Sequence, residues 1–288
     1  AKVRSTSPAG WSEDDRIDPK VAECLHIADA FERADDFDIL HNGFDFLPLT
    51  YSRLVITPVV TTIHGFSSEK IVDVYERYNA NTHYVAISEA DRHPRLHYSA
   101  TIHHGIDLDA FRVHPDPQNY LLFFGRIHPD KGTATAIEVA RRAGHPLVIA
   151  GIIQDEGYFR DEIEPHIDGK NVTFLGPVAT NHRTDLLGRA HALLHLIDFD
   201  EPFGYSVVEA MACGTPVIAY NRGSMGELID QATTGFIAAN LDEATDSVRL
   251  ANTLDRHEIR ASTAARFSAS TMVDRYSALY ERILNETT

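Results

Sequence analysis

The chain has 288 residues, which is long for one hydrophobic core and sufficient for two domains. Its formal net charge of −16 argues against nucleic acid and anionic membrane surfaces as partners, because both select basic patches. No apolar run approaches the roughly 20 residues of a membrane span, and two cysteines make no disulfide framework, so we expect a cytoplasmic protein without stable membrane association.

The first part of the chain predicts one helix followed by several short strands. Segment 19–35 has apolar residues near helical spacing. The apolar runs after it are β-branched and do not alternate, which is typical of strands buried on both faces of a parallel sheet. We expect these strands at 37–40, 57–63, 83–88 and 99–102.

After Gly105, strands and helices alternate. Strands are expected at 120–124, 146–151, 171–176, 191–197 and 216–220, and helices at 133–144, 155–167, 181–190 and 204–214, before two or three final helices. Alternation at this spacing indicates a doubly wound α/β sheet. Two such series, 1–105 and 106–270, imply two similar Rossmann-like domains that face a cleft.

The stretch EPFGYSVVEAMACGTPVIA contains two glutamates, Glu201 and Glu209, around a turn and an apolar run. The turn follows a predicted strand, and a helix begins near Gly204 or Tyr205. The free N–H groups of Phe203 and of these two residues would face an anion at the helix start. Glu209 lies one turn further in, where it could accept the hydroxyls of a ribose. Alternatively, Glu201 caps the helix and Glu209 is half exposed.

A second stretch, FFGRIHPDKG, places two cations on a loop between a predicted strand and a helix. Gly125 forms the turn after the strand, and Arg126 and Lys131 follow it. Two cations at the carboxyl end of a strand could clamp a diphosphate and neutralise the charge that develops on a departing phosphate. The alternative is a solvated surface loop. The spacing does not match a Walker P-loop.

Together these stretches resemble the group 1 (family 4) retaining glycosyltransferases of the GT-B fold. Further matching segments are TTIHG (61–65), VAISE (85–89), HHGID (103–107), TTGFIA (233–238) and MVDRYSALYERIL (272–284). The resemblance implies a GT-B-like α/β protein whose closing helix, at 271–288, returns toward the first domain. The family's usual N-terminal strand, Gly-rich loop and helix are not seen, so the first domain is expected to be incomplete.

The resemblance also implies a reaction, in which a hexose moves from a nucleoside-diphosphate sugar to a hydroxyl acceptor with retention of anomeric configuration. Arg126 and Lys131 would hold the diphosphate and Glu209 the ribose, while Glu201 would contact the sugar ring. The amides of the turn before the helix would lie near phosphate and sugar. His64 matches the family's first-domain histidine beside the donor sugar; alternatively, it is an ordinary loop histidine.

The sequence is compatible with three hypotheses about the function. The first is the glycosyltransferase, with a small acceptor in solution and no cofactor. No metal is expected either, because the histidines are scattered. The second is a nucleotide-sugar-binding module without turnover, since the acceptor half is incomplete. The third is a fold relative, such as a phosphorylase or an epimerase, although none of the lysines has a recognisable pyridoxal context. The nucleotide base, the sugar, the acceptor and the oligomeric state are not specified.

Overall fold

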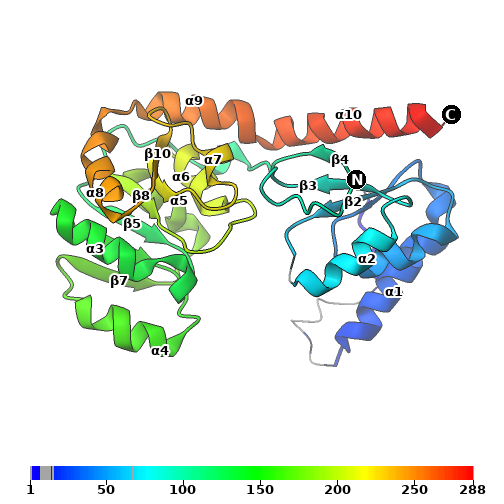
Figure 1. Cartoon of the computed structure of the whole chain (residues 1–288), viewed down its shortest axis with the longest axis horizontal. Helices are drawn as coiled ribbons and strands as arrows, with labels where there is room; N and C mark the ends of the chain where they lie inside the picture. Colours follow the sequence, from blue (N-terminus) through cyan, green and yellow to red (C-terminus); the bar gives the residue numbers. More distant parts are fainter. Residues whose placement is uncertain (1, 7–13, 15, 67, 288) are drawn as a thin grey trace. The chain divides into compact units, whose positions relative to one another are not determined.

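The computed structural model describes residues 2–6, 14, 16–66 and 68–287 (Figure 1). The chain divides into two compact units. The first comprises Ala1–Ile87, Arg92–Thr101 and Tyr276–Thr288, and the second comprises Ser88–Asp91 and Ile102–Arg275. The sequence predicted domain boundaries near residues 105 and 270. In the structure the last boundary falls inside the final helix, so that the end of this helix belongs to the first unit.

The first unit is built on a four-stranded parallel sheet. Its strands are β1 (Leu40–Asn42), β2 (Val59–Ile63), β3 (His83–Ala86) and β4 (Tyr98–Thr101), and they lie in this order. Every residue of β2 is buried, as expected of a central parallel strand. The prediction for β1 was displaced toward the N-terminus, because Phe37 lies outside the sheet and is 48% exposed.

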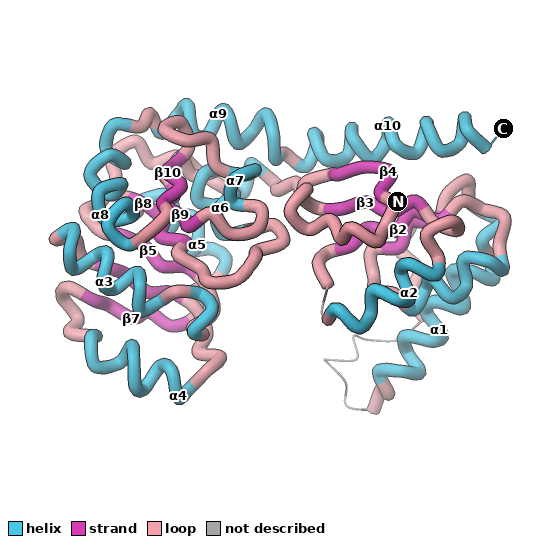
Figure 2. Tube along the Cα trace, in the orientation of Figure 1, coloured by secondary structure: helices cyan, strands magenta, loops and turns pink. Residues whose placement is uncertain are grey.

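Helices cover both faces of this sheet (Figure 2). They are α1 (Pro19–Glu32), α2 (Val72–Arg77) and the second half of α10 (Ala269–Thr287). Successive residues of a strand point to opposite faces. Accordingly, Ile63 packs in one core with Tyr75 of α2, whereas the hydroxyl of its neighbour Thr62 lies 2.7 Å from that of Tyr276 on α10.

The second unit contains a six-stranded parallel sheet in the order β10-β9-β8-β5-β6-β7. The strands are β5 (Leu121–Phe124), β6 (Leu147–Ala150), β7 (Val172–Gly176), β8 (Ala192–His195), β9 (Val217–Tyr220) and β10 (Gly235–Ala238). From β5 the chain builds outward through β6 to β7. It then crosses back and builds outward in the other direction from β8 to β10. The order of strands therefore reverses between β5 and β8.

Helices cover both faces of the second sheet as well. They are α3 (Thr133–Ala143), α4 (Glu156–Tyr158), α5 (Thr180–Arg189), α6 (Tyr205–Ala212), α7 (Met225–Leu228), α8 (Leu241–Leu250) and α9 (Arg256–Phe267). Helix α3 packs against α8, and α6 packs against α9 (Figure 1). Leu121 and Phe123 of β5 share a core with Ile137 of α3. This arrangement confirms the predicted α/β class with parallel sheets.

Three features of the secondary structure differ from the sequence prediction. The helix expected over 155–167 is short, and a π turn (Phe159–Ile163) and a 3-10 turn (Glu164–His166) continue it. Pro165 has no N–H to donate and disfavours a continuous α-helix there. Strand β10 and helix α2 were not predicted as elements.

Candidate functional site

A cavity of about 280 Å³ opens in the second unit where the strand order reverses. Its lining comes from the ends of β5 and β8, the turn before α3, helix α5 and the start of α6. The residues are Phe123, Phe124, Gly125, Arg126, Lys131, Arg183, Leu194, His195, Ile197, Glu201, Gly204, Tyr205 and Ser206. Open α/β sheets bind ligands outside the carboxyl ends of their strands at such a switch point.

Two glycines allow the chain to form this site. Gly132 has a left-handed φ of 72°, and a Cβ there would lie 1.9 Å from the carbonyl oxygen of Leu196. Gly204, the residue before α6, has a φ of 97°, and a Cβ there would approach Met225 Cε to 2.8 Å. Both positions favour glycine, because L-residues rarely adopt this backbone conformation. Together they fix the starts of α3 and α6 beside the cavity.

The structure brings the two predicted cations together with Glu201. Lys131 Nζ lies 2.9 Å from Glu201 Oε2 and 4.1 Å from the centroid of the Phe199 ring. Arg126 is partly exposed, and its guanidinium is 3.8 Å from the carboxylate of Asp130. The lysine is therefore held by a carboxylate of the same cavity, whereas the arginine has only a distant anionic partner among the described residues.

Glu209 is buried, with 6% of its surface exposed, so the alternative of a half-exposed side chain is wrong. Its Oε1 lies 2.9 Å from Arg183 Nη2 in an ion pair, and its Oε2 has no hydrogen-bond partner among the described residues. Burial raises the pKa of this carboxyl to about 7, and the Arg183 charge opposes the rise. Arg183 lines the cavity and Glu209 lies behind it.

Sequence reasoning missed Arg183 and His195. His195 ends β8, and its Nε2 is buried, lacks a hydrogen-bond partner in the described part of the chain and lies 3.9 Å from Glu201 Oε2. Burial, and then the charge of Lys131, lowers the pKa of His195 to about 3, so the imidazole is neutral. A polar residue at the carboxyl end of an apolar strand was the available signal. Arg183 had none, because its partner lies on another helix.

The aromatic residues at the start of α6 have different environments. Phe203 is 2% exposed, and its ring centroid is 5.0 Å from that of His104. Tyr205 is 49% exposed and stacks on the same imidazole, also at 5.0 Å. The side chain of Phe203 is thus part of the core. Its role toward a ligand, as expected from the sequence, rests on its backbone amide.

His64 belongs to the first unit. It follows β2 directly, and its side chain is on an exposed segment at the carboxyl end of that strand. The cavity described above lies within the second unit. The expected role of His64 beside a donor sugar is therefore a proposal that rests on the motif alone.

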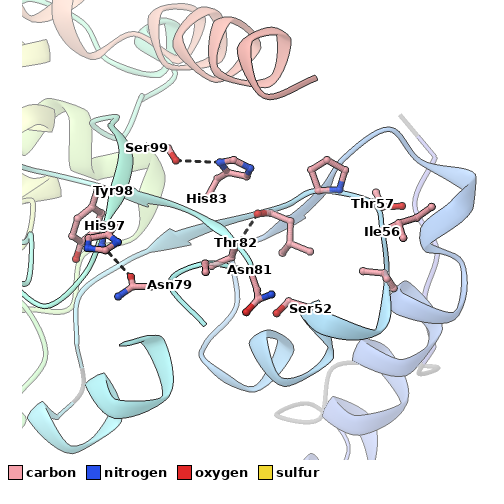
Figure 3. A pocket seen from close by; sticks show the side chains of 14 residues that line it. Ser52, Ile56, Thr57, Asn79, Asn81, Thr82, His83, His97, Tyr98 and Ser99 are labelled. Atoms are coloured by element: carbon pink, nitrogen blue, oxygen red, sulfur yellow. Dashed lines mark hydrogen bonds between the residues drawn. The ribbon is translucent and has the colours of Figure 1, made fainter. Parts of the chain in front are cut away.

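The first unit has a hollow of its own, of about 420 Å³, at the amino ends of β2, β3 and β4 (Figure 3). Several of its polar side chains already have partners. Ser52 and Thr57 donate to backbone carbonyls, and His83 Nδ1 lies 3.2 Å from Ser99 Oγ. Because open α/β sheets bind ligands at the opposite ends of their strands, this hollow is a poor candidate for the functional site.

Among the residues that the structure describes, no helix is both long and apolar enough to cross a membrane. Within the same residues, no group of three or more His, Cys, Asp or Glu side chains is arranged to hold a metal ion.

A comparison with protein families gives the site its context. The model described as "Glycosyl transferases group 1" matches residues 107–267, which is more than half of the chain and includes every residue that lines the cavity. The chain belongs to this family.

Among curated proteins, this chain is similar to the D-inositol 3-phosphate glycosyltransferase of Mycolicibacterium smegmatis. The two are 29% identical over 252 residues, which cover 78% of this chain and 57% of the relative. The chain therefore spans little more than half the length of that protein. The protein of the same name from Mycobacterium tuberculosis is also 29% identical to this chain, which covers 51% of its length.

Solved structures show the same fold at lower identity. A glycosyltransferase from Rickettsia africae matches with a TM-score of 0.75 and 17% identity, covering 99% of this chain and 84% of the other. Anabaena HepE in complex with UDP matches with a TM-score of 0.74 and 19% identity, covering 92% and 84%. The fold of this chain is that of the GT-B glycosyltransferases.

Proposed function

We propose that the second unit binds a nucleoside-diphosphate sugar and that the protein transfers the hexose to a hydroxyl acceptor with retention. The observation that carries the proposal is the convergence of Arg126, Lys131 and the start of α6 on one cavity at the switch point. Cationic side chains and the N-terminus of a helix are both suited to bind phosphate.

The ion pair between Lys131 and Glu201 supports a division of roles within this cavity. A bound diphosphate would displace Glu201 from Lys131 and would also contact Arg126. Glu201 would then be free to accept hydroxyls of the sugar. Glu209 would accept hydroxyls of the ribose, and Gly125, with the amides before α6, would lie along the phosphates. His64 remains a proposed contributor from the first unit.

The chemistry that this site would support is a substitution at the anomeric carbon. The acceptor oxygen forms a bond to that carbon as the bond to the phosphate oxygen breaks. The departing diphosphate takes up the acceptor's proton on the same face of the sugar, so the configuration is retained. Arg126 and Lys131 would stabilise the negative charge that grows on the leaving group, which is where electrostatic catalysis contributes most.

The titles and names of similar proteins suggest the first compounds to test. Structures of HepE contain UDP, UDP-glucose, or UDP and glucose. The mycobacterial relatives are named for D-inositol 3-phosphate. UDP-glucose is therefore our first donor, with GDP- and ADP-glucose beside it, and a small polyol phosphate is our first acceptor.

A thermal-shift screen with these donors tests the proposal, because a ligand that binds the native state raises the melting temperature. Donor turnover with and without acceptors follows, and nuclear magnetic resonance of the product reads its anomeric configuration. We expect a shift with one of the donors and a product of retained configuration. No shift with any donor, or an inverted product, would contradict the proposal.

A binding module without turnover is the second candidate. The observation that favours it is the smaller sheet of the first unit. This sheet has four strands among the described residues, whereas the sheet of the second unit has six. The two candidates differ in one result. A donor that raises the melting temperature but releases no nucleoside diphosphate with any acceptor would favour the module.

We further propose that turnover needs no metal ion, because the two cations and the helix start can neutralise the diphosphate. Turnover should survive an excess of EDTA. Its complete loss, with recovery on adding Mn²⁺, would count against this part of the proposal.

A further inference from the structure

The ion pair between Arg183 and Glu209 joins two helices at the edge of the cavity. Arg183 lies on α5 and Glu209 on α6, and their contact of 2.9 Å bridges 26 positions of the sequence. The arginine side chain is 32% exposed and the glutamate side chain 8%. The carboxylate thus sits behind the guanidinium, within the protein.

Each partner of this pair has an unused hydrogen-bonding group. Glu209 Oε2 is buried and accepts nothing from the described residues, and Arg183 Nε is also buried without a partner among them. A carboxylate has about four lone-pair positions, so the arginine on Oε1 does not saturate it. Buried acceptors are normally satisfied, so Oε2 has the capacity to accept a hydrogen bond from a further donor.

We infer that Arg183 is a positioning residue for the nucleoside end of the donor: it holds Glu209 as an ionised carboxylate and leaves Oε2 to accept the ribose hydroxyls. This inference rests on the proposed function, because it assumes a nucleotide in the cavity. Arg183 need not touch the donor. It acts through Glu209, which alone would be costly to keep charged at this depth.

Among the described residues, the other elements packed against α6 offer Glu209 no equivalent cation. On α9, Arg256 donates to the carbonyls of Gly188 and Ala190, and Arg260 donates to the carbonyl of Ala212 at the far end of α6.

Two further titratable groups near α6 are neutral. Cys213, just after α6, is neutral because burial raises the pKa of its thiol to about 12. His195 on β8 is neutral as well. Arg183 is the group whose charge lowers the pKa of Glu209.

The sign of the pH dependence follows from the geometry. The ionised carboxylate accepts ribose hydroxyls better than the neutral acid, so affinity should improve as pH rises through about 7, the pKa that burial gives Glu209. An opposite charge at this distance lowers a carboxyl pKa by roughly one to three units. Without Arg183 the improvement should therefore occur at higher pH.

Calorimetric titration between pH 6 and 9 tests this inference. The ligands are UDP, GDP or ADP, whichever binds the wild type most tightly, and its 2′,3′-dideoxy counterpart. The two ligands carry the same phosphates, so titration of the phosphates cancels between them. The variants are Arg183→Met, Arg183→Lys and Glu209→Gln. Arg189→Met is the matched control, because Arg189 is exposed on the same helix and its loss changes the charge equally.

We expect Arg183→Met to bind the ribose-containing diphosphate about tenfold more weakly at pH 7 and to approach the wild type by pH 9. Arg183→Lys should lie between them, and Arg189→Met should follow the wild type. In Glu209→Gln, the difference in affinity between the two ligands should no longer depend on pH. The dideoxy ligand should bind all of these variants alike.

Several results would overturn the inference. Equal weakening of both ligands in Arg183→Met would indicate direct contact or a structural defect, and a loss that pH does not restore would do the same. Tighter or unchanged binding in Arg183→Met would show that the arginine competes with the ribose or is irrelevant. If the wild type binds no nucleoside diphosphate, the proposed function fails and this inference with it.

Discussion

Two buried side chains of the cavity region, Glu209 and His195, have pKa values that move in opposite directions for one reason. Burial disfavours the charged form, so it raises the pKa of the acid to about 7 and lowers that of the base to about 3. Their effects on folding stability should therefore have opposite signs: burial of Glu209 costs stability as pH rises, and burial of His195 costs stability as pH falls. Each effect is measured against a variant that lacks the titrating group.

For Glu209 the folded-state pKa is raised, so stability is complete below the unfolded value of 4.5 and falls as pH rises toward 7. Glu209→Gln removes this titration. We expect the variant to gain on the order of 2–3 kcal/mol over the wild type between pH 5 and pH 8, or several degrees in melting temperature. Thermal unfolding of both proteins without ligand at the two pH values measures it. A constant difference would contradict the buried, charge-disfavouring site.

For His195 the folded-state pKa is lowered, so the wild type loses stability as pH falls below the unfolded value of 6.5. His195→Leu has nothing to titrate there and should gain on the wild type by about 1 kcal/mol between pH 7 and pH 5.5. Denaturant unfolding at both pH values checks this. Parallel stability curves for the two proteins would mean that the imidazole is solvated.

At the scale of single residues, the sequence predicted those residues of the candidate site that belong to a local motif. Arg126, Lys131 and Glu201 were predicted because each belongs to a strand-to-helix turn whose position in an α/β sheet is known in advance. Arg183 could not be predicted, because its importance comes from a partner on another helix. The burial of Glu209 was left open for the same reason, since tertiary packing decides it.

At the scale of elements, most strands of the second unit were predicted to within about two residues. The apolar run 120–124 became β5, Leu121–Phe124, and 216–220 became β9, Val217–Tyr220. Runs of this kind are reliable because a strand buried on both faces must be apolar throughout. The prediction was wrong in part where a proline interrupts a helical pattern, as at Pro165.

The start of α6 provides a prediction at this scale. Gly204→Ala should cost about 1–2 kcal/mol, because its φ of 97° is strained for an L-residue, and should also weaken nucleoside-diphosphate binding. Gly144→Ala is the matched control, since Gly144 has a φ of 69° with open space around it and ends α3 instead. Chemical unfolding and calorimetry should show destabilisation in both variants, larger at Gly204 because its Cβ would approach Met225 Cε to 2.8 Å, and lost affinity only at Gly204. Equal affinities would contradict the role of this helix start.

At the scale of the whole molecule, the charge distribution constrains how a nucleotide would bind. The chain carries a formal net charge of −16, yet Arg126, Lys131 and Arg183 all line one cavity. A negative molecule does not steer a free nucleotide toward itself. Affinity must therefore come from short-range contacts within the cavity, and single cations should matter more than overall charge.

The central claim is that this cavity binds the diphosphate of a nucleotide sugar, and calorimetric titration of cation variants tests it most directly. The proteins are the wild type, Arg126→Ala, Lys131→Ala and the control Arg222→Ala, whose guanidinium pairs with Asp198 at 3.0 Å outside the cavity lining. The ligands are UDP, GDP and ADP. Arg126→Ala and Lys131→Ala should each weaken the best ligand roughly ten- to a hundredfold, as expected for the loss of a charged hydrogen bond, while Arg222→Ala binds like the wild type. Unchanged affinity in both cavity variants, or no binding of any of these ligands by the wild type, would contradict the account.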